Sequence, residues 1–302
     1  MNKNIKLLNM SDINYLKNNI TAIIVIYDVT FQILKCLNNL KDISIIIVDN
    51  GRCDRKIIDQ ILKFKNIKYI KSKKNLGFGR ANNFAFKLVK TKYTLLINAD
   101  VVTTTNDLIN LLQTLESYPN TAIAVPLLVD EKNENFDHIE VLPEIGEKFA
   151  KIDENKIGLK KNLLSGDTCI SFCWAAIMLL NNSVVKKVGL FNKKYFLYWE
   201  DYELCRKLFF LKLPIVKSYN SKALHLKHAS VNYSILNYFT MQFHHVYSSY
   251  LYFNLKKKDF IILKRIFIYL FRFLTYLMRL KIKKSIKNLA RLVAIIKYKL
   301  KK

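Results

Sequence analysis

Apolar and polar positions alternate in blocks along the first hundred residues of the chain. Four short runs rich in isoleucine, valine and leucine are separated by stretches in which apolar residues recur every three or four positions, as in residues 31–40. The runs are residues 21–27, 43–48, 67–71 and 94–98. Near-continuous apolar strands that alternate with amphipathic helices are typical of a parallel sheet covered on both faces. The pattern therefore predicts an α/β fold with a Rossmann-like, mostly parallel sheet.

Polar residues gather where each predicted strand ends. They are Asp28, Asp49, Asn50, Asn98, Asp100 and the segment 75–83 (NLGFGRANN). Asn, Asp and Gly also build turns and helix caps, and for Asp28 alone a turn is the favoured interpretation. Because the carboxyl ends of parallel strands meet at one edge of the sheet, the four groups together predict a composite ligand site there.

A dinucleotide site is an alternative for the third of these groups. Gly77, Phe78 and Gly79 resemble the start of the G-x-G-x-x-G fingerprint, and Asp100 follows at a distance suited to a ribose contact. However, Asn82 stands at the third glycine position, and the segment follows the third strand instead of the first. We therefore expect no nicotinamide or flavin site. The sequence also contains no G-x-x-x-x-G-K-[ST], which excludes a P-loop.

Aromatic residues surround a pair of acids in residues 188–206 (VGLFNKKYFLYWEDYELCR). The acids are Glu200 and Asp201, and apolar residues with helical spacing follow them. One interpretation is a helix whose first turn carries acids that suit its macrodipole. Placing a carboxylate among apolar groups costs free energy, so such a group indicates a functional site, and it is suited to take a proton from a hydroxyl. Further along, His225 and His228 lie near a predicted strand end, where a lone His is more often a hydrogen-bonded core residue than a ligand.

Charge divides the chain into segments. Nine of the 23 acids fall within residues 130–154, which predicts a surface excursion between two folded halves. Residues 256–302 carry 16 Lys and Arg but one acid. We expect one domain over residues 1–253, with halves at about 20–129 and 165–253, and a basic helical tail over residues 254–302.

The basic tail indicates which kind of polyanion the positively charged protein binds. A formal charge of +27 attracts polyanions such as nucleic acid, anionic lipid or phosphorylated small molecules. Residues 260–302 contain no Gly or Pro and predict a helix, on which Arg265, Arg272 and Arg279 form one stripe amid apolar residues. A basic amphipathic helix suits the surface of an anionic membrane. The alternative is a helical extension packed on the domain with solvated charges.

The sequence argues against secretion, a membrane-spanning segment and a nucleic-acid partner. The five cysteines have no paired short spacing, which indicates a reduced, cytosolic compartment. The first residues lack the apolar core of a signal peptide, and no apolar run reaches the roughly 18 residues of a spanning helix. A nucleic-acid-binding protein is permitted by the charge, but no recognised binding motif occurs and we expect no nucleic-acid partner.

Taken together, these segments resemble the inverting glycosyltransferases of family 2, which have the GT-A fold. The resemblance is greatest to the bacterial rhamnosyltransferase-like branch, and it covers residues 21 to about 230 in family order. The segments that carry it are IIVIYD (23–28), IIIVDN (45–50), NLGFGRANN (75–83), LLINADV (95–101), VGLFNKKYFLYWEDYELCRK (188–207) and HLKHAS (225–230).

The resemblance implies a role for each matching residue. Asp201 would be the general base, with Glu200 beside it in the catalytic pair. Asp100, in Asn98-Ala99-Asp100, and His225 would hold a divalent cation, Mg²⁺ or Mn²⁺. The nucleotide-sugar would contact Tyr27, Asp49, Asn75, Gly77, Phe78 and Asn98. Asp28, Ala99, Asn192, Lys227 and His228 depart from residues common in the family.

The resemblance also implies substrates and a location. The donor would be a dTDP- or UDP-sugar carrying rhamnose or another hexose, and the acceptor a polyprenyl-diphosphate-linked glycan of a cell-surface polysaccharide such as lipopolysaccharide. The protein would then lie in the cytoplasm, peripherally on the inner face of the bacterial cytoplasmic membrane. A catalytically silent scaffold with the same fold is the alternative of another class.

Overall fold

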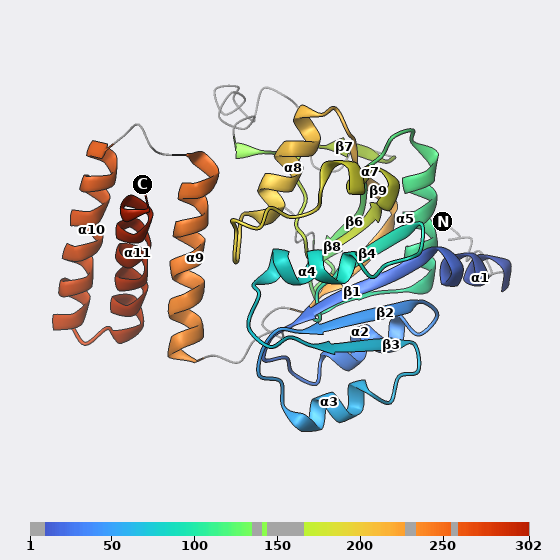
Figure 1. Cartoon of the computed structure of the whole chain (residues 1–302), viewed down its shortest axis with the longest axis horizontal. Coiled ribbons are helices and arrows are strands. Elements are labelled where there is room, and N and C mark those ends of the chain that lie inside the picture. Colours follow the sequence, from blue (N-terminus) through green and yellow to red (C-terminus); the bar gives the residue numbers. More distant parts are fainter. Residues whose placement is uncertain (1–9, 135–140, 144–165, 227–233, 255–258, 302) are drawn as a thin grey trace.

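The structure is a computed structural model that describes residues 10–134, 141–143, 166–226, 234–254 and 259–301. Most of the predicted excursion at residues 130–154 and His228 lie outside the described residues. Figure 1 shows two parts, a sheet flanked by helices and a group of three helices beside it.

The four strands predicted in the first hundred residues are present and each begins within one residue of its predicted start. They are β1 (Ile20–Ile26), β2 (Ser44–Asp49), β3 (Ile67–Lys71) and β4 (Tyr93–Ile97). They are parallel to one another in the order β3-β2-β1-β4, as the alternating pattern predicts. Continuous burial explains their composition, because all residues of β4 and nearly all of β1 are buried.

The chain after β4 extends this sheet with strands of mixed direction. These strands are β5 (Val101–Thr103), β6 (Ile123–Val129), β7 (Thr168–Ile170), β8 (Ile177–Asn181) and β9 (Ile215–His225). The sheet continues from β4 as β8-β6-β9-β5, and β7 pairs with β9. Here β8 runs antiparallel to β4, and β5 runs antiparallel to β9. The long strand β9 thereby returns the chain to the edge of the sheet where β4 ends.

Helices cover both faces of the sheet, as predicted (Figure 1). One apolar core lies against α2 (Ile33–Asn39), α3 (Arg55–Ile61) and α5 (Thr105–Ser117). The other lies against α4 (Phe78–Phe86), α7 (Asn182–Val188) and α8 (Glu200–Phe210). The short α1 (Met10–Asn19) precedes β1 and buries Leu16 in the first core. The loops before α4 and α8 open at the same edge of the sheet, which is the edge predicted to hold the ligand site.

The C-terminal region is a three-helix unit of α9 (Ile235–Phe253), α10 (Asp259–Met278) and α11 (Ile282–Leu300). The predicted helical tail is confirmed, but it forms two helices instead of one, because the chain reverses at Leu280, which adopts the left-handed backbone with φ of 51°. The reversal lets α10 and α11 bury apolar residues against each other and α9, which offsets the strain of a left-handed leucine. The predicted division after residue 253 falls between α9 and α10, whose side chains share this core.

The reversal also divides the predicted arginine stripe. Arg265 and Arg272 lie on α10, whereas Arg279 follows its last residue. The guanidinium of Arg265 donates to the hydroxyl of Tyr250 on α9 at 3.0 Å and lies over its ring, so Arg265 also anchors α10 to α9. Within the described residues, no helix combines the length and the apolar character that crossing a membrane requires.

Candidate active site

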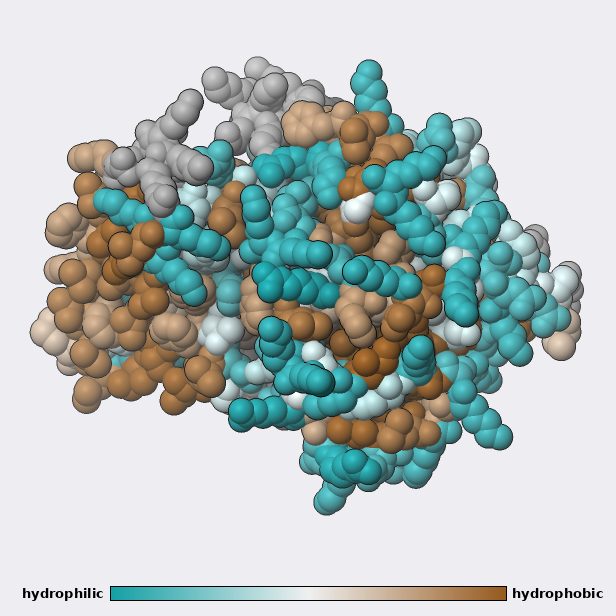
Figure 2. Space-filling view, in the orientation of Figure 1, coloured by the Kyte–Doolittle hydropathy of each residue, from teal (hydrophilic) through white to brown (hydrophobic). Residues whose placement is uncertain are grey.

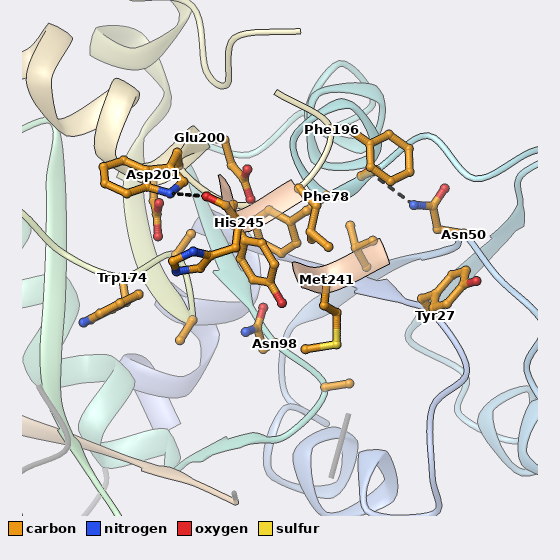
Figure 3. A pocket seen from close by; sticks show the side chains of 18 of the residues that line it. Tyr27, Asn50, Phe78, Asn98, Trp174, Phe196, Glu200, Asp201, Met241 and His245 are labelled. Atoms are coloured by element: carbon orange, nitrogen blue, oxygen red, sulfur yellow. Dashed lines mark hydrogen bonds between the residues drawn. The ribbon is translucent and has the colours of Figure 1, made fainter. Parts of the chain in front are cut away.

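One pocket of about 450 Å³ lies at the predicted edge of the sheet. It is lined by residues from the ends of β1, β2 and β4, from the loops before α4 and α8, and from α9. Figure 3 shows Tyr27 and Asn50 toward one end, Trp174 and Asp201 toward the other, and Asn98 and Met241 between them. The fold therefore brings into one cavity groups that lie more than 170 residues apart in the sequence. The polar residues at the strand ends of the first hundred residues predicted one part of this cavity.

Asparagine side chains build the end of the pocket near Tyr27. The Asn50 amide donates to Asn75 Oδ1 at 2.9 Å and to the Gly77 carbonyl at 3.2 Å, and it accepts from the Leu76 N–H at 2.7 Å. The Asn75 oxygen also accepts from the Gly77 N–H at 2.9 Å. These bonds fix the loop before α4 to the end of β2. Asn50 is thus a positioning residue that the sequence placed at a strand end but did not single out.

Asp49 lies beneath this end of the pocket and is fully buried. Its carboxylate accepts from Tyr69 Oη at 2.5 Å, from Lys71 Nζ at 2.6 Å and from the Gly51 N–H at 3.0 Å. Burial alone would raise the pKa of Asp49, but the hydrogen bonds from Lys71 and Tyr69 outweigh burial and lower it. Asp49 does not line the pocket, unlike its neighbour Asn50.

Asp100 and His225 meet because β5 runs antiparallel to β9. The register pairs Val101 with His225, and the Leu226 N–H donates to the Asp100 carbonyl at 2.8 Å. Asp100 Oδ1 lies 3.9 Å from His225 Nε2, is buried, and has no hydrogen-bond partner among the described residues. His225 and Asn98 line the pocket, whereas the buried Asp100 does not. The sequence thus predicted a pair that the sheet topology brings together.

The segment that begins α4 clamps the loop before α8. The Phe78 N–H donates to the Phe196 carbonyl at 2.9 Å, and the Asn83 amide makes two bonds to the backbone of Phe191, at 2.7 and 3.0 Å. Gly77 has φ of 77°, and a Cβ there would overlap the Phe196 carbonyl oxygen. Glycine is therefore required both for the left-handed backbone and for the close approach. Gly77 and Phe78 also line the pocket, where the sequence predicted them.

The acid pair begins α8 directly after two residues in an unusual conformation. Tyr198 and Trp199 both have left-handed backbones, with φ of 64° and 68°. Consecutive non-glycine residues in this region store strain, which structures retain mainly at functional sites. The surrounding contacts hold it, because the Trp199 indole N–H donates to the His245 carbonyl at 3.2 Å and its ring packs on Tyr202 and Tyr252.

The two carboxylates differ in environment. Glu200 is 5% exposed, and its Oε2 has no hydrogen-bond partner among the described residues. Burial raises the pKa of the Glu200 carboxyl, and the adjacent Asp201 carboxylate raises it further. Asp201 keeps part of its side chain open to the pocket, and the Tyr202 N–H donates to it at 2.9 Å. Burial raises the pKa of Asp201 above that of an ordinary aspartate despite this bond. Asp201 is therefore the acid suited to accept a proton from a bound molecule.

One wall of the pocket belongs to α9, which the sequence analysis did not connect with the site. The lining residues of α9 are Asn237, Thr240, Met241 and His245. Three of them follow one another at intervals of four, which places them on one helical face. The Tyr27 hydroxyl lies 3.5 Å from Asn237 Oδ1, so α9 also contacts the end of β1. The polar residues Asn237, Thr240 and His245 within a largely apolar helix were the available signal, but which element they face depends on how α9 packs.

The sequence matches a known family and a curated relative. Residues 21–189 match the glycosyl transferase family 2. Rhamnosyltransferase WbbL of Escherichia coli (strain K12) is 29% identical over 191 residues, which cover 58% of this chain and 71% of WbbL.

Solved structures share the fold at low sequence identity. Staphylococcus aureus TarS 1-349 superposes with a TM-score of 0.54 at 13% identity, covering 94% of this chain and 92% of that chain. A mannosyltransferase from Pyrobaculum calidifontis, in complex with GDP-Man and Mn²⁺, has a TM-score of 0.54 at 11% identity and covers 78% of this chain and 64% of that one. GalNAc-T7 with UDP, GalNAc and Mn²⁺ has a TM-score of 0.53 at 12% identity, and the match covers 69% of this chain and 43% of GalNAc-T7.

The fold is that of the GT-A glycosyltransferases, and the resemblance drawn from the sequence motifs is confirmed. The chain belongs to glycosyl transferase family 2, and its similarity to WbbL supports the rhamnosyltransferase-like branch. It is a glycosyltransferase of glycan synthesis.

The role of Gly77 yields a testable prediction. We expect Gly77→Ala to lower the free energy of unfolding by about 2 kcal/mol or more, since alanine adds both left-handed strain and overlap with Phe196. Gly189→Ala is the matched control, because Gly189 has φ of 79° but open space around it. Denaturant titration of both variants measures the difference, and equal losses would contradict a requirement for close approach at Gly77.

Proposed function

We propose that the protein transfers a sugar from a nucleoside-diphosphate donor to a hydroxyl of a lipid-linked glycan, with inversion at the anomeric carbon. The observation that carries the proposal is the pocket itself, in which the partly desolvated carboxylate of Asp201 faces the same cavity as the polar ends of β1 and β4. The family match supports glycosyl transfer as the reaction class. The position of Asp201 in the pocket supports a mechanism in which a carboxylate acts as the base.

In the proposed reaction, Asp201 takes the proton of the acceptor hydroxyl as its oxygen attacks the anomeric carbon. The new carbon–oxygen bond forms on the face of the sugar opposite the diphosphate. The bond between the anomeric carbon and the diphosphate oxygen breaks, and the nucleoside diphosphate leaves with the electron pair of that bond. One displacement gives inversion, and only one carboxylate has to act as a base. Glu200 remains protonated near neutral pH because burial and Asp201 both raise its pKa. A neutral Glu200 leaves the single negative charge of the pair on Asp201.

Asp100 and His225 fit the divalent cation that the fold family implies. The buried Asp100 Oδ1 has no hydrogen-bond partner among the described residues and lies 3.9 Å from His225 Nε2, and a carboxylate with an imidazole suits Mn²⁺. The structures of similar fold that contain Mn²⁺ support this assignment. Within the described residues no third His, Cys, Asp or Glu joins the pair, so other ligands would come from the donor and water. When bound, Mg²⁺ or Mn²⁺ would neutralise charge on the departing diphosphate.

The donor and acceptor follow from the relatives and from the pocket. WbbL is a rhamnosyltransferase, and structures of similar fold contain UDP, UDP-GlcNAc or GDP-Man. We propose a dTDP- or UDP-sugar as donor, with its nucleotide toward Tyr27 and Asn75 and its sugar toward Asp201. The acceptor would be a polyprenyl-diphosphate-linked glycan at the inner face of the bacterial cytoplasmic membrane.

The proposed base is tested by Asp201→Asn. We expect transfer to fall by roughly 10²-fold or more, because an amide cannot accept the proton, while folding and nucleotide binding stay near wild type. Glu203→Gln is a matched control in the same helical turn, since Glu203 does not line the pocket. Radiolabelled transfer and thermal unfolding measure the two properties. Full activity of Asp201→Asn would remove Asp201 as the base.

The raised pKa of Asp201 predicts the acidic side of the pH profile. The base acts as a carboxylate, so kcat/KM falls as the pH drops through the pKa of Asp201 in the folded protein. We expect this fall well above the ordinary aspartate value of about 3.9. Glu200→Gln should keep the same fall in kcat/KM at acidic pH, because it replaces a carboxyl group that is already neutral in that pH range. If the fall in kcat/KM at acidic pH disappears in Glu200→Gln, the titrating group is Glu200 and not Asp201.

Donor and cation binding are tested by thermal shift with UDP, dTDP and GDP, each with and without Mn²⁺. A ligand that binds the folded state raises Tm by mass action. We expect one diphosphate to raise Tm only with Mn²⁺, and Asp100→Asn to remove that dependence while keeping the side-chain shape. Silence from all three diphosphates would favour a catalytically silent scaffold.

A further inference from the structure

Exposed apolar side chains gather on one face of α10. Nine large apolar residues of this 20-residue helix are exposed, and the most open are the phenylalanines 260, 267 and 271 and Met278, at 69–80%. The nine are Phe260, Leu263, Phe267, Ile268, Leu270, Phe271, Leu274, Leu277 and Met278. Most of them follow at intervals of three and four, which places them along a single side of the helix. In Figure 2 the apolar surface covers the end of the molecule formed by the three-helix unit.

This face is not needed for the core of the three-helix unit. The opposite side of α10 carries Ile262, Ile266 and Tyr269, which pack against α9 and α11. On α11 the exposed residues Ile282, Val293, Ile296 and Leu300 add to the apolar surface. An apolar area of this extent is uncommon on a monomeric soluble protein and marks a surface that binds something.

The charge around the face selects the partner. In α9, α10 and α11 the sole acidic residue is Asp259, at the very start of α10. Basic residues border the face on α10, at Lys264 and Arg272, and recur along α11. A second copy of the chain would bring two such cationic surfaces together, which their repulsion opposes. An anionic surface with an apolar interior meets both requirements.

We propose that the outward face of α10 docks into an anionic lipid bilayer. The helix lies in the plane of the interface, with its phenylalanines in the acyl boundary and Lys264 and Arg272 among the phosphate groups. Apolar burial supplies most of the binding, and the cations supply the preference for anionic lipid. The sequence predicted an arginine stripe as the contact, whereas here the contact is an apolar face with a basic border.

Docking in this way fixes the pocket relative to the membrane. The same α9 that packs on α10 and α11 through Phe243, Val246 and Tyr250 lines the pocket with Met241 and His245. One helix, α9, therefore belongs both to the core beneath the docking face and to the wall of the pocket. Binding to lipid does not depend on the proposed transfer reaction, but its benefit to a lipid-linked acceptor rests on that reaction.

The test is flotation of the full chain with vesicles of phosphatidylcholine alone and of phosphatidylcholine with phosphatidylglycerol. We expect binding to the anionic vesicles that weakens in high salt, and weaker binding to the neutral ones. Phe267→Ser with Phe271→Ser should lower the partition coefficient at least about tenfold, because two exposed rings lose their burial in lipid. Deletion of α10 is unsuitable, since it would uncover the core of the unit.

Matched controls distinguish docking through α10 from nonspecific hydrophobic binding and from misfolding. Phe271→Ser is compared with Phe210→Ser, because these rings are 71% and 73% exposed but Phe210 lies at the end of α8. Unchanged Tm verifies folding, since neither ring is part of a core. Absence of vesicle binding, or equal binding by the double variant, would overturn the proposal. So would a dimer in analytical ultracentrifugation that the double variant dissociates while vesicles fail to bind. Nucleotide-dependent Tm shifts in all variants report the proposed function separately.

Discussion

The hydrogen bonds between α4 and the loop before α8 are the constraint on which the site depends. Asn83 holds the backbone of Phe191 and Phe78 holds that of Phe196, and each joins the first half of the sheet to the second. The loop that leads to the acid pair, between α7 and α8, has no regular secondary structure of its own. Its position is therefore set from outside, by a helix more than 100 residues earlier in the chain.

This external support explains how a strained backbone can stand next to the proposed base. The left-handed Tyr198 and Trp199 turn the chain sharply so that α8 begins with Glu200 and Asp201 at the pocket. Aromatic packing around Trp199 and the hydrogen bond to His245 oppose relaxation of the turn. The aromatic residues that stood out in the sequence thus do two things: they desolvate the acids and they hold the turn that aims them.

Local pattern was sufficient to predict the parallel strands and the polar groups at their ends, because β1, β2 and β4 are buried along nearly their whole length and each strand end is marked by polar residues within a few positions. The association of Asp100 with His225 came from the family resemblance and not from local pattern, since their contact depends on the antiparallel pairing of β5 with β9. The part played by α9 could not be predicted, because nothing in an apolar helix tells which neighbour it packs against. The reversal at Leu280 was missed for a simpler reason, as a leucine gives no sign of a left-handed turn.

The double role of α9 has a consequence for how such enzymes can be recombined. A chimera that exchanges the three-helix unit must begin its replacement near Ser234, where α9 is capped, because a junction at residue 253 would divide a shared core. The exchanged piece then brings Asn237, Thr240, Met241 and His245 with it. Surface attachment and one wall of the pocket are thus inherited together, and an engineer who replaces the first also replaces the second.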